Sequence, residues 1–399
     1  MVYVISGVAF TGNKGASGMA EAIIQNLSAR NPQNNFYIYT YYPCQDTKKN
    51  LYDNVTLIDA TPIAVVMNVL FALWAVCCIF LKLPAFFYKK RSLIKAILRA
   101  DYWLDTSGIS FSDGREKYLI YNVLSLLPAL ILKCRIVKMP QALGPFKNKI
   151  NRYCSSLVLP KMKLICARGA ATCNYLKDLG LKNYSFYPDI AFSLKTSPLD
   201  KQNISSYIDL SYKQFIGLSP SQVVYRLCNK NGIDYLKILK DVTEKLIEKN
   251  YKVVVFAHSI RTQTKKTHNN DLPLIKKFAE MLEDHDHLCF VEKDHTAAEL
   301  RELIGSFDLL IASRFHAVIS AICTYTPVIT LGWSHKYEEV LSEFGIGDYA
   351  VSYNDLCSGK LLALIDKTER AKHEIKLRIK NNLPKTKDKI EELYSVITQ

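Results

Sequence analysis

Arg314 and His316 are the two residues whose types and spacing point most directly to chemistry. They follow the apolar run 308–312 and precede a run of small and apolar residues, which predicts a buried strand followed by a helix. A guanidinium group binds a carboxylate or a phosphate through two parallel hydrogen bonds. A histidine at the positive end of a helix donates a hydrogen bond or a proton. This segment is therefore predicted to bind an anion.

Further cationic residues follow other predicted strands of the C-terminal half: Arg226, His258, His335 and Lys336. In open α/β sheets, ligands bind at the carboxyl ends of the strands, so we expect these residues to contribute to the same site. For His258, a purely structural histidine at the end of a strand is an equally good interpretation.

Two glycine-containing loops follow predicted strands in the N-terminal half. Loop 11–18 lies between a strand and a helix, whose free N–H groups suit an anion or a polar sugar group. Any tight turn of an α/β protein has this pattern, but we take Asn13, Gly15 and Ser17 as candidate substrate-binding residues. Loop 105–114 begins with Asp105, which either accepts a proton from a sugar hydroxyl or caps a turn.

The sequence has no Walker A, GxGxxG, HExxH or GxSxG pattern. Its eleven cysteines are scattered and form no CxxC pair. We therefore expect buried, reduced thiols in a cytosolic protein and no metal site. The N-terminal run MVYVISGVAF has no preceding basic residues, so it is predicted to be a first strand and not a signal peptide.

Strand-like and helical runs alternate along the 399 residues, which is the pattern of parallel sheets covered by helices. We expect an N-terminal Rossmann-like domain over 1–195, a polar linker over 196–212 and a second Rossmann-like domain over 213–365. A charged helical tail over 366–399 is expected to be interrupted at Pro384. The predicted fold class is α/β, with two doubly wound domains facing a cleft.

The positive charge is concentrated in the N-terminal half. Residues 1–200 contain 24 Lys/Arg and 11 Asp/Glu, a net of +13, and residues 201–399 contain 28 and 26, a net of +2. An anionic membrane surface, a phosphorylated substrate or a nucleic acid would each complement this charge. The sequence shows no nucleic-acid-binding module and no interleaving of basic and aromatic residues, so no nucleic-acid partner is expected.

The segment 63–81 contains nineteen residues without a charge and is long enough to span a membrane. Aromatic residues and then the basic cluster 89–91 follow it, a pattern typical of a helix that lies in the membrane interface. A buried core helix and a true span are the alternatives, but a span would separate the first two predicted strands from the rest of their sheet. We therefore predict an apolar, membrane-facing helix within 63–88.

Together these motifs resemble the polysaccharide pyruvyl transferase family. The resemblance runs in order from about residue 3 to about residue 350 and rests on GNKGASGMAEAI, LDTSGISFSD, MPQALGPF, YPDIAF and, most specifically, SRFHAVISAICTYTPVITLGWSHKY. It implies a GT-B-like fold and the transfer of pyruvate from phosphoenolpyruvate to sugar hydroxyls. The product implied is a cyclic ketal on a surface polysaccharide or its lipid-linked precursor.

The same resemblance implies that Arg314 and His316 bind phosphoenolpyruvate in the C-terminal domain and that the N-terminal domain takes the acceptor. The expected acceptor is a saccharide or a polyprenyl-linked oligosaccharide. Ketal formation requires a general acid and a general base. We predict that His316 acts as the acid or stabilises the phosphate, that Asp105 is the base, and that no cofactor is needed beyond the donor substrate.

Two other functions are compatible with the sequence. A sugar-nucleotide glycosyltransferase of GT-B fold would bind a nucleotide diphosphate in the same cleft. A non-enzymatic, membrane-associated protein would bind an anionic glycolipid through the basic half. For the pyruvyl transferase, we expect a cytoplasmic protein that is peripheral on the inner face of the cell membrane, with the anionic membrane surface as a partner.

Overall fold

The computed structural model describes residues 1–208, 211–212, 214–261, 269–283, 286–334 and 336–399, so the predicted site residue His335 lies outside the described residues. The chain forms two compact units. Unit 1 comprises Met1–Thr11, Met19–Ser193 and Asp388–Gln399. Unit 2 comprises Gly12–Gly18 and Leu194–Lys387. Most of the first predicted loop therefore belongs to the second unit, although its position in the sequence led us to expect it in the N-terminal domain.

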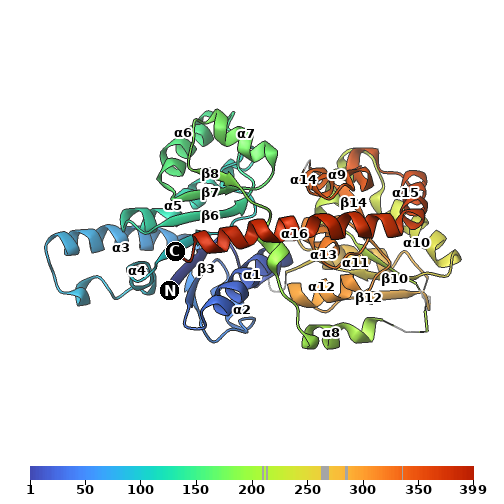
Figure 1. Ribbon diagram of the computed structural model, residues 1–399, viewed down its shortest axis with the longest axis horizontal. Coiled ribbons are helices and arrows are strands. Elements are labelled where there is room, and N and C mark those ends of the chain that lie inside the picture. Colours follow the sequence, from blue (N-terminus) through green and yellow to red (C-terminus); the bar gives the residue numbers. More distant parts are fainter. Residues whose placement is uncertain (209–210, 213, 262–268, 284–285, 335) are drawn as a thin grey trace. The chain divides into compact units, whose positions relative to one another are not determined.

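Unit 1 is built on a seven-stranded parallel sheet in the order β4-β3-β1-β5-β6-β7-β8 (Figure 1). Its strands are β1 (Val2–Ser6), β3 (Asn35–Thr40), β4 (Val55–Asp59), β5 (Tyr102–Asp105), β6 (Ile136–Gln141), β7 (Leu164–Ala167) and β8 (Tyr184–Phe186). After β4 the chain returns to the other side of β1 and continues with β5. The loops after β1 and β5 therefore diverge at a topological switch point, where open α/β sheets bind ligands.

The helices of unit 1 are α1 (Lys14–Arg30, from Met19 onward), α2 (Pro43–Thr47), α3 (Pro62–Phe80), α4 (Ser92–Ile97), α5 (Leu119–Ile131), α6 (Lys149–Val158) and α7 (Ala170–Asp178). Helices α3, α4 and α5 pack against one another. The core beneath them includes the fully buried indole of Trp103, whose Nε1 donates a hydrogen bond to Oγ of Ser6 at 2.8 Å. A buried indole thus has the partner that its N–H requires.

Unit 2 is built on a six-stranded parallel sheet in the order β12-β10-β9-β13-β14-β15. Its strands are β9 (Phe215–Ser219), β10 (Lys252–Phe256), β12 (Leu288–Val291), β13 (Leu309–Ala312), β14 (Val328–Gly332) and β15 (Ala350–Ser352). Its helices are α8 (Pro198–Ile204), α9 (Gln222–Lys230), α10 (Tyr235–Glu248), α11 (Leu272–Ala279), α12 (Ala297–Gly305), α13 (Phe315–Cys323), α14 (Lys336–Glu343), α15 (Ser358–Arg370) and α16 (Lys372–Val396, up to Lys387). Continuous apolar strands covered by helices agree with the doubly wound α/β pattern expected from the sequence.

A separate two-stranded antiparallel ladder joins β2 (Gly12–Asn13) to β11 (Ser259–Ile260). Asn13 is paired with Ser259, and Gly12 is paired with Ile260. This ladder ties the Gly12–Gly18 loop to the segment that follows β10, and so to unit 2.

The polar segment 196–212 contains a helix, α8, although we expected it to be a linker. A capping box formed by Ser197 and Asp200 starts this helix. The amide of Asn203 donates a hydrogen bond to Glu299 of α12 at 2.7 Å. These contacts place the segment in unit 2.

The expected interruption at Pro384 is wrong, because α16 continues through this residue. A proline inside a helix removes one backbone hydrogen bond. The apolar residues that precede and follow it along the helix, such as Leu383 and Ile390, are buried. Their packing compensates for the bond that the proline lacks.

Candidate functional site

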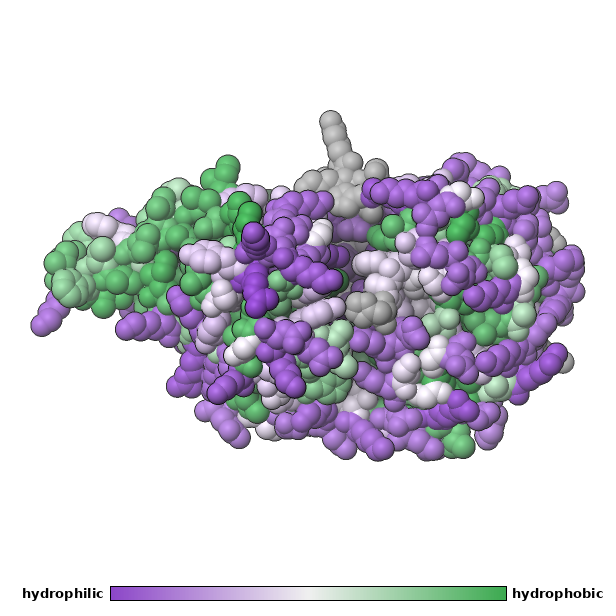
Figure 2. Space-filling view, turned by 90° about the horizontal axis from the view of Figure 1, so that it is seen from above, coloured by the Kyte–Doolittle hydropathy of each residue, from purple (hydrophilic) through white to green (hydrophobic). Residues whose placement is uncertain are grey.

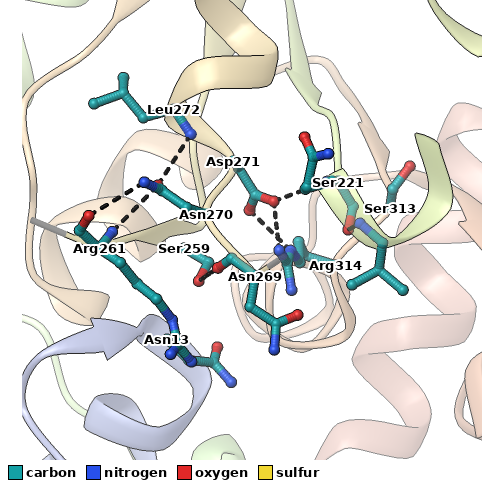
Figure 3. Close-up of polar contacts among 12 residues, drawn as sticks. Asn13, Ser221, Ser259, Arg261, Asn269, Asn270, Asp271, Leu272, Ser313 and Arg314 are labelled. Atoms are coloured by element: carbon teal, nitrogen blue, oxygen red, sulfur yellow. Dashed lines mark hydrogen bonds and ion pairs between the residues drawn. The ribbon is translucent and has the colours of Figure 1, made fainter. Parts of the chain in front are cut away.

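Arg314 and Asp271 form a buried ion pair at the carboxyl ends of the strands of unit 2 (Figure 3). Arg314 is the N-cap residue of α13, immediately after β13, and Asp271 precedes α11. The arginine Nε donates to Oδ2 of Asp271 at 2.8 Å, and its Nη2 donates to Oδ1. The backbone N–H of Gln222 donates to the same Oδ1 at 3.0 Å. The two hydrogen bonds from Arg314 to Asp271 fix the plane of the guanidinium group.

The surroundings of this pair keep Arg314 charged. Burial by itself lowers the pKa of Arg314, but the carboxylate of Asp271 outweighs this effect and raises the pKa above its ordinary value. Burial also raises the pKa of Asp271, against the opposing effect of Arg314. The third guanidinium nitrogen, Nη1, lies outside the pair. The ion pair with Asp271 therefore fixes the orientation of the Arg314 guanidinium group, including that of Nη1.

His258 belongs to unit 2 together with Arg314, His316 and Lys14, and its carbonyl accepts a hydrogen bond from the backbone N–H of Lys14 at 3.4 Å. Burial of its ring, followed by the charges of His316, Arg314 and Lys14, lowers the pKa of His258 well below its ordinary value. The ring is therefore neutral near pH 7. We call Lys14, Arg314 and His316 the cation cluster. Arg314 and His316 were predicted as site residues and Lys14 was not; all three belong to unit 2.

Lys14 is held in this cluster by two contacts. Its Nζ forms a buried ion pair with Oδ1 of Asp294 at 2.5 Å, and its backbone N–H donates to the carbonyl of His258 at 3.4 Å. A lysine with so little exposure requires such a partner, because an unpaired buried charge costs several kcal/mol.

The Gly12–Gly18 loop lies against His316. A β-carbon on Gly15 would fall 2.0 Å from Nδ1 of His316, so only glycine allows this approach. Asn13 accepts a hydrogen bond from the backbone N–H of Gly15 at 3.0 Å. The buried Ser17 donates to the carbonyl of Lys14 at 3.3 Å. In the structure, Asn13 and Ser17 therefore shape the loop that positions Lys14 and contacts His316.

Lys336 lies among three aromatic rings at the start of α14. Its Nζ is 4.8 Å from the ring centre of Phe315, 4.9 Å from that of Trp333 and 5.2 Å from that of Tyr337. Phe315 in turn meets the ring of His316 edge to face at 5.4 Å. Cation–π contacts hold the ammonium group beside the strand end that carries Arg314 and His316.

Arg226 is less closely tied to the site. It lies on α9, one turn after Gln222, whose backbone N–H binds Asp271, and its own side chain is exposed. The structure brings its helix to the site but gives no contact between its guanidinium group and the cation cluster in the described part of the chain.

Asp105 lies in unit 1, at the switch point between β1 and β5. The buried Nζ of Lys138 donates to Oδ2 of Asp105, and Oδ1 accepts hydrogen bonds from Ser6 at 3.3 Å and from Ser107 at 3.2 Å. A small polar pocket opens here, and Asp105 lines it together with Ser6, Gly7, Tyr39, Ser107, Ser110 and Asn122. The structure therefore places Asp105 at a polar pocket, with a lysine as its charge partner.

Residues from three other sequence segments of unit 1 hold the loop after Asp105 in place. Gln141 donates from Nε2 to the carbonyl of Asp105 at 3.0 Å. Arg168 donates to the carbonyl of Gly108 at 2.9 Å and forms a buried ion pair with Asp189. Three sequence blocks that lie far apart along the chain thus support one loop.

Sequence reasoning missed Lys14, Asp271, Asp294 and Lys138. Asp271 and Asp294 belong to no recognisable motif, because each has a role only through an ion pair with a residue far away in the sequence, Arg314 and Lys14 respectively. Lys138 had a usable signal, because a lysine within the apolar run IVKMP requires a buried anion as its partner. In the part of the chain that the structure describes, no group of three or more His, Cys, Asp or Glu side chains is arranged to hold a metal ion. All eleven cysteines are free thiols.

Comparison with solved structures identifies the fold. UDP-GlcNAc 2-epimerase from Methanocaldococcus jannaschii superimposes with a TM-score of 0.59 at 15% identity, covering 92% of this chain and 91% of that protein. UDP-GlcNAc 2-epimerase from Neisseria meningitidis, solved with bound UDP-GlcNAc, gives a TM-score of 0.57 at 12% identity and covers 100% of both chains. At these identities the likeness shows the fold alone, and it confirms the predicted GT-B-like class.

Sequence comparison identifies the family. The amylovoran biosynthesis protein AmsJ of Erwinia amylovora is 21% identical over 248 residues, which are 60% of this chain and 59% of AmsJ. The chain thus spans about three fifths of the length of this curated relative. The family model for polysaccharide pyruvyl transferase matches residues 13–335, which include the cation cluster and Asp105. The chain therefore belongs to the polysaccharide pyruvyl transferase family.

Proposed function

We propose that this protein transfers pyruvate from phosphoenolpyruvate to two hydroxyl groups of a sugar, forming a cyclic ketal on a polysaccharide or on its lipid-linked precursor. One observation carries the proposal: in a member of this family, Arg314 and His316 follow strand β13 of unit 2, and the Gly12–Gly18 loop that carries Lys14 contacts His316. The saccharide acceptor agrees with the similarity to AmsJ, an amylovoran biosynthesis protein.

The cation cluster suits the charge of this donor. Phosphoenolpyruvate carries a carboxylate and a phosphate, and both groups accept charge-assisted hydrogen bonds. Arg314, oriented by Asp271, offers its remaining nitrogen at the positive end of α13. Lys336 supplies a further cation beside Phe315. Arg226 and His335, which lies outside the described residues, stay candidate donor-site residues.

The reaction requires four coupled changes. The methylene carbon of the donor accepts a proton, which leaves a positively charged centre at the neighbouring carbon. A sugar hydroxyl adds to this centre and gives up its proton. The carbon–oxygen bond to phosphate breaks, and a second hydroxyl closes the ring with loss of its proton. The products are the ketal and inorganic phosphate, so no redox partner is needed.

We assign the acid step, or the stabilisation of the departing phosphate, to His316. Its ring is held against the Gly15 backbone, which fixes its orientation. We assign the base step to Asp105, at the polar pocket of unit 1. His258 is neutral and is assigned to shaping the cation cluster.

The decisive experiment incubates the protein with phosphoenolpyruvate and lipid-linked oligosaccharides. Phosphate release and the mass of the oligosaccharide are recorded together. The wild-type protein is expected to release phosphate and to add pyruvyl groups to the acceptor. The variant Arg314→Ala is expected to lose both signals, and Arg99→Ala, an exposed arginine of unit 1, is expected to retain them. Full activity in Arg314→Ala would contradict the donor-site assignment.

The same experiment separates the two other functions. A sugar-nucleotide glycosyltransferase would leave phosphoenolpyruvate intact and would be stabilised against heat by UDP or GDP sugars instead. A non-enzymatic glycolipid-binding protein would bind the oligosaccharide without changing its mass.

A further inference from the structure

Helix α3 buries only a narrow stripe of its surface. The buried positions are Val65, Asn68, Ala72, Ala75 and Cys78, and the small residues among them pack with Ile94 of α4. Large apolar side chains cover much of the rest and are exposed: Ile63, Val66, Leu70, Leu73, Trp74, Val76, Ile79 and Phe80. Ile63 and Phe80 expose 80% and 84% of their surface. By length and composition the helix is apolar enough to cross a membrane, yet only 28% of it is buried.

The exposed apolar surface continues beyond the end of α3. The short helix η1 (Ala85–Phe87) presents Phe86 and Phe87, of which Phe86 is 70% exposed. Nε1 of Trp74 donates a hydrogen bond to the carbonyl of Phe87 at 3.2 Å and so ties the two elements together. Figure 2 shows a continuous hydrophobic area over this part of unit 1. We call the exposed apolar side chains of α3 and η1 the apolar platform.

A cluster of cations borders the apolar platform. Lys82, Lys89, Lys90 and Arg91 are all exposed. The ammonium group of Lys90 lies 4.5 Å from the ring centre of Phe86, and the guanidinium group of Arg91 lies 4.5 Å from that of Phe71. Cations beside aromatic rings are the combination that suits the headgroup level of a bilayer with anionic lipids.

The topology of the sheet excludes a crossing of the membrane. The strand before α3 is β4 and the strand after it is β5, and both belong to the same parallel sheet of unit 1. A single crossing would place these strands on opposite sides of the bilayer. The chain therefore enters and leaves this region on one side, as a helix lying in the interface does.

We propose that the apolar platform inserts into one leaflet of a bilayer that contains anionic lipid, with Lys82, Lys89, Lys90 and Arg91 at the level of the headgroups. A contiguous exposed apolar area of this kind marks an interaction surface. The positive charge beside the platform favours an anionic bilayer over a second copy of the chain. A second copy docked through the same face would bring two like-charged clusters together, whereas anionic headgroups complement them.

No residue of the apolar platform is assigned to the reaction, so its test needs neither donor nor acceptor. The full-length protein is sedimented with vesicles of phosphatidylcholine alone or with about one third phosphatidylglycerol. Binding is expected to be stronger to the anionic vesicles and to weaken with added salt. Absence of binding to both kinds of vesicle would overturn the proposal, and equal binding to both would overturn the role of the cations.

Matched variants localise the effect. Phe80→Glu/Phe86→Glu changes two highly exposed residues of the platform and is expected to abolish sedimentation. Leu51→Glu, at a leucine of unit 1 that is 77% exposed outside the platform, is expected to leave binding unchanged. Lys89→Ala/Lys90→Ala is expected to weaken binding to anionic vesicles by about fivefold for each cation removed. Lys177→Ala/Lys182→Ala, at exposed lysines elsewhere in unit 1, serves as its control.

Light scattering of the same variants tests whether a second copy of the chain covers the apolar platform instead of a bilayer. A stable dimer that forms without vesicles, and that Phe80→Glu/Phe86→Glu converts to monomer, would overturn the proposal in favour of self-association. The phosphate-release assay on each variant keeps this result separate from the proposed reaction. A platform variant that releases phosphate normally from phosphoenolpyruvate, in the presence of a water-soluble acceptor, but binds no vesicles supports the membrane role alone.

Discussion

The backbone of Gly15 touches the imidazole ring of His316, since a β-carbon at Gly15 would lie 2.0 Å from Nδ1. We predict that Gly15→Ala lowers pyruvyl transfer by about a hundredfold, because the added methyl group displaces the ring from its reacting position. Phosphate release from phosphoenolpyruvate measures the effect, and circular dichroism verifies that the fold is retained.

The matched control for this substitution is Gly359→Ala. A β-carbon at Gly359, in the first turn of α15, meets no atom within 4 Å. Its activity is expected to equal that of the wild type. Equal activity of Gly15→Ala and Gly359→Ala would show that the contact with His316 plays no part in the reaction.

Our second prediction concerns the ion pair between Arg314 and Asp271. Asp271→Ala leaves a buried guanidinium group without its partner, which is expected to lower the free energy of unfolding by about 3–5 kcal/mol. Arg314→Met is expected to cost a similar amount by leaving Asp271 unpaired. The double variant is expected to be more stable than the sum of the two losses predicts. Urea unfolding measures all three, and strictly additive losses would contradict the pairing.

The activity of a conservative variant separates the effect of the planar guanidinium group of Arg314 from the effect of its charge. Arg314→Lys retains the positive charge but not the planar fork, so it is expected to raise the KM for phosphoenolpyruvate and to lower kcat/KM. Unchanged kcat/KM in Arg314→Lys would show that the fork geometry is dispensable.

Much of the fold was predictable from the sequence because hydrophobic pattern governs it. The runs 252–258 and 308–312 became the buried strands β10 and β13, since a parallel strand covered on both faces is almost wholly apolar. The short strand β8 escaped prediction because its three residues carry little pattern. Helix α8 was taken for a linker, although Ser197 and Asp200 at capping-box spacing were a signal for its start.

The site was predictable only in part, because tertiary contacts complete it. Arg314 and His316 stood out since polar groups at the end of an apolar strand need a reason to be there. Asp271 had no such signal, because it lies more than forty residues from Arg314 and only the fold brings them together. The placement of the Gly12–Gly18 loop in unit 2 likewise depends on its ladder with β11, which no local pattern indicates.

Lys138 and Asp105 give the third prediction. Lys138→Met leaves the buried carboxylate of Asp105 without a charge partner, so the free energy of unfolding is expected to fall by about 3–5 kcal/mol. Adding Asp105→Asn removes the unpaired charge and is expected to restore part of the loss. Thermal or urea unfolding measures both variants.

The restored double variant also tests Asp105 as the base. If Asp105 accepts the hydroxyl proton, Lys138→Met/Asp105→Asn remains folded but loses pyruvyl transfer. Transfer at nearly the wild-type rate in the folded double variant would assign Asp105 to holding Ser6 and Ser107 instead.

His258 gives the fourth prediction, which concerns pH. Burial and the charges of His316, Arg314 and Lys14 lower its pKa in the folded protein well below 6.5, whereas the unfolded chain retains the ordinary value near 6.5. Below about pH 6.5 the unfolded chain therefore binds more protons than the folded protein does. The contribution of this group to stability is fully present above pH 6.5 and is lost as the pH falls, by about 1.4 kcal/mol per pH unit at most.

The comparison of wild type with His258→Gln isolates this contribution from that of other buried groups. Urea unfolding at pH 7.5 and at pH 5.5 is expected to show a larger loss of stability in the wild type than in His258→Gln, because glutamine does not titrate. His287→Gln, at a histidine of unit 2 whose Nε2 contacts Asn250 at 3.0 Å on the surface, serves as the control and is expected to follow the wild type. Parallel pH dependence of the wild type and His258→Gln would mean that His258 already carries a proton among the cations of the folded site.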